Sequence, residues 1–475
     1  MSSSDLTPDL CVIGAGSGGL SIAAGAVQMG ASVVLIEKGE MGGDCLNYGC
    51  VPSKAILAAA KQAQSMRDAA KFGVAAVEPD VDFAAVMDHV HDVIAGIAPH
   101  DSQERFEGLG VRVIRSAGRF VGPDRVQAGG QTIRARRFVV ATGSRPVAPP
   151  IPGLSDVPYF TNETIFENRT KPTHLLIIGG GPIGMEMAQA HRRLGAVVTV
   201  VDAGKPLSKD DPELTAIAIE RLKAEGVDIR EGAGVDSVER TGEGGVAIIL
   251  NGGERLEGSH LLVAAGRAPN LEGLDLEAAN VRFNRRGIEV DNRLRSVSNN
   301  KVFAAGDAAG QLQFTHVAGY HAGVIIQNVL FRLPSKAKHG AVPWVTYTDP
   351  EVGQVGLTEA QAREAHGDDI RVLRAEFAEN DRARSERRTD GLLKVVTRKN
   401  GKVLGAGIVG AGAGELLAPW ILTVGKGDKV SSIAQSIMPY PTRSEISKRA
   451  AGSFYTPKLY SDRVRKIVRL LAKLG

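Results

Sequence analysis

The chain has 475 residues, a net charge of +4 and a pI near 8.8, with 43% hydrophobic and 23% charged residues. This length predicts two to four domains of roughly 100–200 residues each, and so small a charge excess over so long a chain argues against a nucleic-acid partner. The first residues, MSSSDLTPDL, lack the parts of a signal peptide, and no run of about 18 apolar residues occurs. With only three cysteines, we expect a cytoplasmic protein, in which two closely spaced cysteines are more often catalytic or metal-binding than structural.

Two stretches of the chain share one order of apolar strand, glycine-rich turn, small-residue helix and second apolar strand. In the first stretch the three elements are predicted at residues 10–16, 18–29 and 32–37. In the second they are predicted at 175–181, 183–194 and 197–202. Such units pair their strands in parallel and form doubly wound sheets.

Further apolar strands follow the same pattern of ending in a glycine-containing turn. They are predicted at 138–143, before the proline-rich link 146–152, and again at 261–266 and 302–306. From about residue 334 the pattern changes to a linker (334–342) and then to β-rich runs at 392–397 and 403–409 mixed with helices. We therefore expect an α/β fold with two Rossmann-like dinucleotide-binding domains, followed by a separate α+β domain.

The first glycine-rich turn contains Gly14, Gly16 and Gly19, which have the spacing of a dinucleotide-binding fingerprint. The first glycine permits the tight turn, the second lets the main chain approach a pyrophosphate, and the third lets helix and strand pack closely. The helix N-terminus then offers free N–H groups to the phosphates. Glu37 lies at the end of the next strand, where an acid can bond a ribose hydroxyl pair.

The second turn repeats this arrangement with Gly179, Gly181 and Gly184, and its acid is Asp202. One such motif is weak, but two in matching context favour two bound dinucleotides over ligand-free turns. A carboxylate at Asp202 favours the free 2′-hydroxyl of NADH over the 2′-phosphate of NADPH. Lys205 close by leaves NADPH as the alternative.

Cys45 and Cys50 lie in GGDCLNYGCVPSK, directly after the first strand–helix–strand unit. Taken alone, the spacing is also that of two inert buried thiols. A zinc site is disfavoured because no second Cys or His cluster completes four ligands, so we predict no metal site. Because the motif follows the crevice of the first dinucleotide, and cysteines at a helix start gain thiolate stability from the dipole, a redox-active pair is favoured.

Together these residues resemble the pyridine nucleotide-disulfide oxidoreductases, which include dihydrolipoyl dehydrogenase, glutathione reductase and mercuric reductase. The family motif GGTCxNxGCxPSK is matched with Asp44 in place of the threonine. The resemblance continues through ATGS at 141–144, the second fingerprint, AxGRxPN at 264–270, AAGDAAG at 304–310 and YTDPEVGQVGLTEAQA at 347–362. It covers nearly the whole chain.

The resemblance implies which residues hold the cofactors. The first fingerprint and Glu37 would bind the adenosine half of FAD, and Asp307 its ribityl chain and phosphate. A helix opened by Thr315 and His316 would point at the pyrimidine end of the flavin. The second fingerprint would bind NAD(P)H, and the matching motifs add Thr142, Gly143 and Gly266.

The resemblance also implies the catalytic residues. Cys50 would be the flavin-proximal sulfur and Cys45 the exchanging one, and Lys54 would form an ion pair with Glu186 near the reactive edge of the flavin. Hydride would pass from the nicotinamide to FAD, the flavin would reduce the Cys45–Cys50 disulfide, and the thiolate pair would reduce the substrate.

The chain departs from the family near its C-terminus. Relatives that handle dithiols or glutathione carry HPxxxE, whose His–Glu pair reaches the exchanging thiol of the other subunit. Here the stretch is MPYPTRSE, with Tyr440 in the His position and Glu445 in the Glu position. A His has a pKa of about 6.5 and a Tyr about 10, so Tyr440 is a poor proton shuttle at neutral pH. Mercuric reductases carry a Tyr in this stretch, although this chain has no C-terminal cysteine pair like theirs.

We therefore expect an FAD-dependent NAD(P)H oxidoreductase that works reductively on Hg(II), another metal ion or a small electrophile. A dihydrolipoyl dehydrogenase in which Tyr440 is a packing substitution is the alternative. An alternative of another class is a non-catalytic FAD-binding component of a complex, which the intact cysteine pair and both fingerprints disfavour. We expect a homodimer, with FAD-binding parts at 1–150 and 271–335 around an NAD(P)H domain at 151–270, and a dimerisation domain at 340–475.

Residues 458–475 predict one basic amphipathic helix, because apolar residues recur at helical spacing with Arg and Lys between them. One interpretation is a helix docked on the protein surface, and the other is weak contact with a membrane surface.

Overall fold

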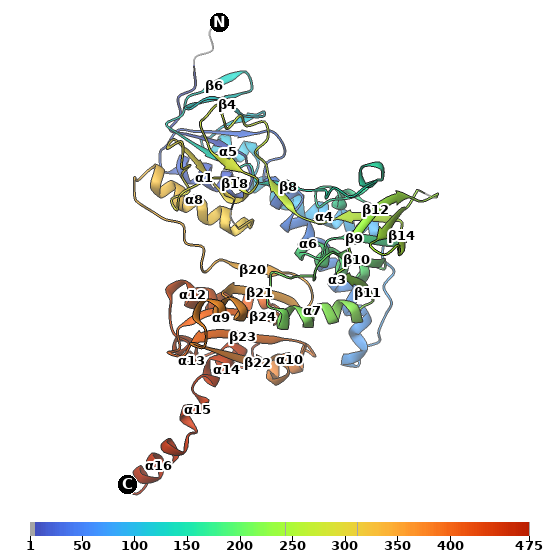
Figure 1. The fold of residues 1–475 in the computed structure, drawn as a ribbon, viewed down its shortest axis with the longest axis vertical. Helices are drawn as coiled ribbons and strands as arrows, with labels where there is room; N and C mark the ends of the chain where they lie inside the picture. The colour runs from blue at the N-terminus through green and yellow to red at the C-terminus, as the bar shows by residue number, and fades with distance from the viewer. Residues whose placement is uncertain (1–4, 243, 311, 475) are drawn as a thin grey trace.

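The first large sheet has five parallel strands in the order β19–β7–β1–β2–β3 in the computed structural model, which describes residues 5–242, 244–310 and 312–474 (Figure 1). The strands are β1 (Leu10–Ile13), β2 (Val33–Glu37), β3 (Arg112–Arg115), β7 (Arg137–Val140) and β19 (Val302–Ala304). Alternate residues of β1 enter different cores. Leu10 and Val12 pack under helices α1 (Ser17–Gln28) and α8 (Thr315–Val329), whereas Cys11 and Ile13 pack on the opposite face. Burial on both faces explains why this strand is a continuous apolar run.

A small antiparallel sheet covers that opposite face of the first sheet. Its strands are β4 (Arg119–Gly122), β5 (Arg125–Ala128) and β6 (Gln131–Ile133). Shorter elements of this part of the chain are α2 (Gly43–Asn47), α5 (Gln103–Gly108), the antiparallel pair β8 (Ser144–Pro146) and β16 (Arg267–Pro269), and the pair β17 (Phe283–Asn284) and β18 (Gly287–Ile288).

The second sheet has four parallel strands in the order β11–β10–β9–β15. They are β9 (His174–Ile178), β10 (Val197–Asp202), β11 (Val227–Glu231) and β15 (His260–Val263), and the helices of this unit are α6 (Pro182–Arg193) and α7 (Pro212–Ala224). The antiparallel strands β12 (Val235–Arg240), β13 (Val246–Leu250) and β14 (Arg255–Gly258) pack on one face of this sheet.

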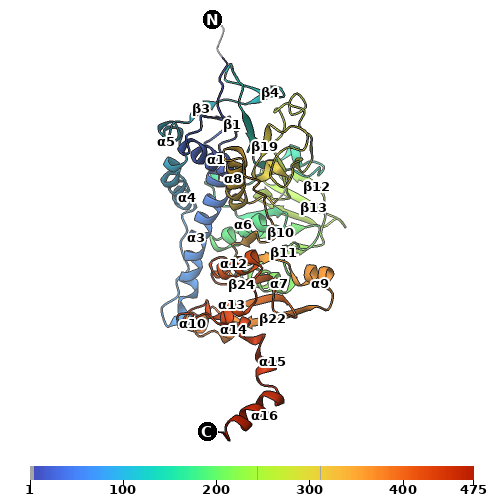
Figure 2. The same ribbon diagram turned by 90° about the vertical axis from the view of Figure 1, so that its left-hand side faces the viewer.

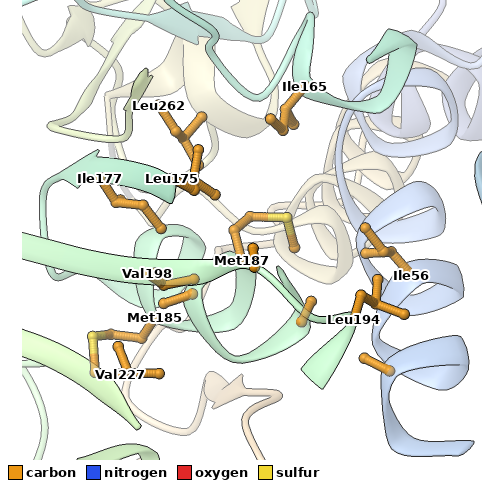
Figure 3. Packing of buried hydrophobic residues seen from close by; sticks show 14 of the residues in the cluster. Ile56, Ile165, Leu175, Ile177, Met185, Met187, Leu194, Val198, Val227 and Leu262 are labelled. Carbon is orange, nitrogen blue, oxygen red and sulfur yellow. The ribbon is translucent and has the colours of Figure 1, made fainter. Parts of the chain in front are cut away.

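Helices α3 (Cys50–Arg67) and α4 (Phe83–Ile97) pack against the other face of the second unit and join it to the first. Figure 3 shows Ile56 of α3 beside Met187 and Leu194 at α6, within the same buried cluster. Figure 2 shows α3 running along one side of the molecule. Because α3 begins at Cys50, this packing fixes where the cysteine motif lies relative to α6.

The third unit is an antiparallel sheet in the order β20–β21–β24–β23–β22. Its strands are β20 (Pro343–Thr346), β21 (Glu351–Gly356), β22 (Ile370–Glu376), β23 (Leu392–Arg398) and β24 (Val403–Gly410). Its helices are α9 (Glu359–His366), α10 (Asp381–Ser385), α11 (Ala413–Leu416), α12 (Ala418–Lys426), α13 (Ser431–Ala434) and α14 (Glu445–Ser453). At its core the buried Trp420 donates from Nε1 to Ser447 Oγ at 3.0 Å.

The predicted fold class is confirmed, since two parallel sheets with helices are followed by an α+β unit. Strand β19 follows the second sheet in sequence but joins the first, so the chain leaves the first unit and returns to it. The domain ranges 1–150, 151–270, 271–335 and 340–475 stay predictions. No described helix is both long and apolar enough to cross a bilayer.

The prediction for the C-terminal segment was wrong in one respect. It forms two helices, α15 (Thr456–Leu459) and α16 (Asp462–Leu471), rather than one. The break comes at Ser461, whose main chain is extended and whose hydroxyl accepts a hydrogen bond from Val464 N, which makes it the N-cap of α16. Residue 475 lies outside the described residues.

Candidate active site

The first glycine-rich turn leaves no space for a side chain at its first and last glycines. Gly14 has a φ of 107°, and a Cβ there would collide with the carbonyl oxygen of Ala141 at the end of β7. A Cβ on Gly19 would collide with the carbonyl of Gly14. Gly16 is the extended N-cap of α1 and provides no capping side chain, so the first N–H groups of the helix stay open to an anion.

The second turn has the same geometry. Gly179 has a φ of 110° and its Cβ would meet Ala264 at the end of β15, while Gly184 packs on the carbonyl of Gly179. Gly181 is the uncapped N-cap of α6, with open space where its Cβ would lie. Gly266, also predicted as a site residue, follows β15 with a φ of 150°. Both turns therefore fit the pyrophosphate of a dinucleotide.

The two acids predicted to bind ribose also brace these turns. Glu37 accepts two main-chain N–H bonds at 2.5 and 2.7 Å, and Asp202 accepts two at 2.6 and 2.7 Å. The donors are Ala15 and Gly39 for Glu37, and Gly180 and Gly204 for Asp202. Each carboxylate oxygen has a second lone pair, so acceptors remain for ribose hydroxyls. The bracing role was not predicted from the sequence.

Asp307 follows β19 in a short turn and is partly buried. Its Oδ2 accepts a hydrogen bond from Ser144 Oγ at 2.5 Å, and burial raises the pKa of its carboxyl group. The neighbouring Thr142 donates from Oγ1 to the carbonyl of Asn270 at 2.7 Å, and Asn270 N donates to the carbonyl of Gly143 at 2.9 Å. These bonds tie the 142–144 turn to the segments that follow β15 and β19.

The two cysteines lie in consecutive helices. Cys45 is in α2, Cys50 opens α3, and both are free thiols. Cys50 Sγ lies 3.5 Å from Oγ1 of Thr315, the first residue of α8. This start of α8 is where the sequence predicted a helix to open.

The two thiols have opposite proton affinities. A hydrogen bond from Cys45, supported by Thr315 and the charge of Lys54, lowers the pKa of Cys50 to about 6 although burial opposes it. The same Cys45–Cys50 bond, together with burial, raises the pKa of Cys45. Near neutral pH the pair therefore carries one proton, with Cys50 as the thiolate.

His316 was predicted to bind the flavin beside Thr315. Its exposed ring stacks on Phe314, with 5.3 Å between centroids, and its Nε2 lies 2.8 Å from the carbonyl oxygen of Pro343. In this structure its side chain is thus bonded to the main chain at the start of β20.

Lys54 and Glu186 form the predicted pair of charges. Lys54 Nζ lies 2.8 Å from Glu186 Oε2 and 4.3 Å from the ring centroid of Tyr347. The other oxygen of Glu186 accepts a hydrogen bond from Tyr347 N at 2.8 Å. Glu186 has a side chain only 6% exposed, so its contacts with the cation and the N–H compensate a charge that would be costly alone. The contact of Tyr347 with Lys54 was not predicted, because the only sign of it in the sequence is the place of Tyr347 in YTDPEVG.

One face of α6 binds the segment that leads into β21. Glu186, Gln189 and Arg193 are spaced three and four residues apart and share that face. Gln189 bonds both the N–H and the carbonyl of Asp349, at 2.7 and 2.9 Å. Arg193 pairs with Glu225 at 2.7 Å and with the Asp349 carboxylate at 3.0 Å. Helix α6 therefore begins at a glycine turn and ends fixed to the third unit.

Asp44, the departure from the family motif beside Cys45, has a charged partner. It lies 3.0 Å from the guanidinium of Arg267, and its Oδ1 accepts a hydrogen bond from Asn162 at 3.0 Å. Arg267 also donates to Ser144 Oγ at 2.8 Å. Polar contacts thus run without a break from Asp44 through Ser144 to Asp307.

Tyr440 and Glu445 lie in the third unit. Tyr440 is 71% exposed, and its hydroxyl donates to Asp381 Oδ2 at 3.1 Å, which raises the pKa of the phenol. Glu445 opens α14 and accepts a hydrogen bond from Thr442 N. Within the described part of one chain, neither residue hydrogen-bonds or ion-pairs with the cysteine motif.

Comparison with known proteins gives two family matches. Residues 8–322 match the family described as pyridine nucleotide-disulphide oxidoreductase, and residues 342–451 match the dimerisation domain of that family.

Individual relatives carry more than one activity. The chain is 35% identical over 457 residues to mercuric reductase from Streptomyces lividans, covering 94% of this chain and 96% of that one. It is 33% identical over 450 residues to dihydrolipoyl dehydrogenase from Geobacillus stearothermophilus, covering 93% and 94%. Among solved structures, the Cu(II) complex of the HOCl-induced flavoprotein disulfide reductase RclA from Escherichia coli matches with a TM-score of 0.84 and 27% identity, over 93% of this chain and 98% of that one. Sequence identity to these relatives therefore does not indicate whether the substrate is a metal ion or a dithiol.

Proposed function

This chain belongs to the pyridine nucleotide-disulphide oxidoreductases, an FAD-dependent family with NAD(P)H as electron donor, and we propose that it works reductively on a metal ion such as Hg(II) or on a small electrophile. FAD, when bound, would accept hydride and supply two electrons to the cysteine pair. The turn braced by Glu37 would hold FAD, and the turn braced by Asp202 would hold the nicotinamide nucleotide. NADH is favoured because a 2′-phosphate would approach the Asp202 carboxylate.

The cysteine pair is suited to deliver those electrons. Reduction of a Cys45–Cys50 disulfide by two electrons and one proton breaks the S–S bond, leaving Cys50 as the thiolate and Cys45 as the thiol, in keeping with the lowered pKa of Cys50. Lys54 would place a positive charge where the reduced flavin is negative, and Glu186 and Tyr347 hold that lysine in place. Two adjacent sulfurs are good ligands for a soft cation.

The observation that carries the reductive direction is Tyr440. A dithiol substrate needs a base with a pKa near the working pH, and the hydrogen bond to Asp381 raises the pKa of Tyr440 further from neutrality. A metal ion held by two thiolates needs no proton delivered to a leaving thiol. The relatives named mercuric reductase and the Cu(II) complex of RclA are in keeping with a metal acceptor.

The dimer would complete the active site. The family's dimerisation domain spans 342–451, and Tyr440 and Glu445 of one subunit would reach Cys45 of the other. A thiol pair that must stay reducible is suited to the cytoplasm, where structural disulfides are rare.

Steady-state rates with NADH and Hg(II), compared with dihydrolipoamide and NAD⁺, test the proposal. We expect Hg(II)-dependent NADH oxidation, its loss in Cys50→Ser, and no loss in Cys11→Ala, which alters a buried thiol. Efficient dihydrolipoamide turnover would contradict the proposed metal-ion substrate and indicate a dihydrolipoyl dehydrogenase. If NADH fails to bleach the flavin absorbance, the protein is instead a non-catalytic FAD-binding component.

A further inference from the structure

Helix α16 has no partner within the chain. No residue of α16 is buried, and Figures 1 and 2 both show it extending away from the third unit at the end of the chain. Five large apolar side chains of residues 462–474 are between 46% and 76% exposed. They are Ile467, Val468, Leu470, Leu471 and Leu474. The segment follows the end of the matched dimerisation domain at residue 451.

Most apolar and basic side chains of α16 lie on opposite sides of the helix. At 100° per residue, Val464, Ile467, Val468 and Leu471 fall on one side of the helix. Arg465, Lys466 and Arg469 fall on the opposite side, Arg463 and Leu470 fall at the borders between the two sides, and Lys473 and Leu474 follow the end of the helix. A helix of ten residues is marginal in water on its own, so a surface that covers the apolar side would stabilise it.

The positive charge of the protein is concentrated in this segment. Residues 458–474 hold six of the 57 basic residues and one of the 53 acidic residues. The rest of the chain therefore has 51 basic against 52 acidic residues and is close to neutral. The surface that complements this segment must be apolar at its centre and negatively charged around it.

We propose that α16 binds an anionic lipid bilayer, lying in the plane of the headgroups with its apolar side towards the acyl chains. Opposed apolar and basic sides are typical of interfacial helices, and each Lys or Arg adds attraction to anionic lipid. A second copy of the chain fits less well, because a nearly neutral body offers no excess negative charge to the helix. One such helix binds weakly and reversibly, and a dimer carries two, which raises the avidity of the whole enzyme.

The test is co-sedimentation of the full-length, flavin-loaded dimer with vesicles. We expect binding to vesicles that contain phosphatidylglycerol, at least about tenfold weaker binding to phosphatidylcholine alone, and release by high salt. Val468→Gln combined with Leu471→Gln should abolish binding by removing the apolar anchor. Replacing Arg465, Lys466, Arg469 and Lys473 with Gln should weaken binding at least about tenfold.

A matched control removes the same number of positive charges from exposed sites elsewhere. It replaces Arg285, Arg286, Lys336 and Lys338 with Gln, all exposed in the structure. This control should bind vesicles like the wild type, and every variant should keep the wild-type rate of flavin reduction by NADH. Equal loss of binding in the control and the α16 variants would overturn the proposal, as would no binding by the wild type. A change of dimer mass in the α16 variants, measured by light scattering, would instead place the helix on the partner subunit and also overturn it.

Discussion

Replacing Cys45 by alanine isolates the contact that makes Cys50 acidic. The hydrogen bond from Cys45 is the largest influence lowering the pKa of Cys50 to about 6. A hydrogen bond to a charged group contributes about 1.5–3 kcal/mol, and one pKa unit corresponds to about 1.4 kcal/mol. At the lower figure, the pKa of Cys50 should rise by roughly one unit, to about 7. Thr315 and Lys54 are unchanged and keep it below the value of a free thiol.

The assay is the pH dependence of iodoacetamide alkylation in the reduced protein, with the modified cysteine located by mass spectrometry. Only the thiolate reacts, so the alanine variant should react more slowly than the wild type at neutral pH and equally fast in strong alkali. Cys11 stays silent because it is buried and its pKa is raised. Cys45→Ser keeps an O–H donor and should titrate close to the wild type. An unchanged midpoint in the alanine variant would refute this account of the Cys50 thiolate.

Three further changes test other parts of the structure. Lys394→Met removes a cation whose side chain is 6% exposed and which pairs with Asp211 at 2.9 Å. The free energy of unfolding in urea should therefore fall by about 3–5 kcal/mol, and an unchanged midpoint of urea unfolding would contradict this. Tyr440→His supplies a base with a pKa near 6.5 and should raise dihydrolipoamide oxidation by about a hundredfold, and no gain would show that Tyr440 does not set the substrate. Asp202→Asn removes the charge facing a 2′-phosphate and should lower KM for NADPH relative to NADH, whereas an unchanged ratio would count against that role.

The repeated strand–turn–helix pattern was predictable because local sequence dictates it. Gly14 and Gly179 occupy backbone conformations with positive φ that only glycine adopts readily, and β1 is buried on both faces, so its sequence is continuously apolar. These signals do not depend on distant residues. They were sufficient to predict two parallel sheets and most of their strands, although β3 and β11 were not predicted.

The contacts that hold the site together were less predictable, since they join residues far apart in sequence. Tyr347 contacts Lys54 across nearly three hundred positions. Arg267 forms an ion pair with Asp44, and although each residue lies in a recognisable motif, neither motif indicates the other. The break in the C-terminal segment at Ser461 depended on one capping hydroxyl. That hydroxyl is a weak local signal within a strong amphipathic pattern.

The place of β19 in the first sheet has a consequence for how the chain folds. Val302 of β19 pairs with Phe138 of β7, so the whole second unit is synthesised between two neighbouring strands. On the ribosome the second unit emerges complete before β19 is available, and domains generally fold as units in the order in which they appear. Until β19 arrives, β7 presents an unpaired strand edge that is apolar apart from Arg137, the kind of edge that recruits other chains. A nascent chain stopped between residues 270 and 300 should therefore be far more prone to aggregate than one that is a few dozen residues longer.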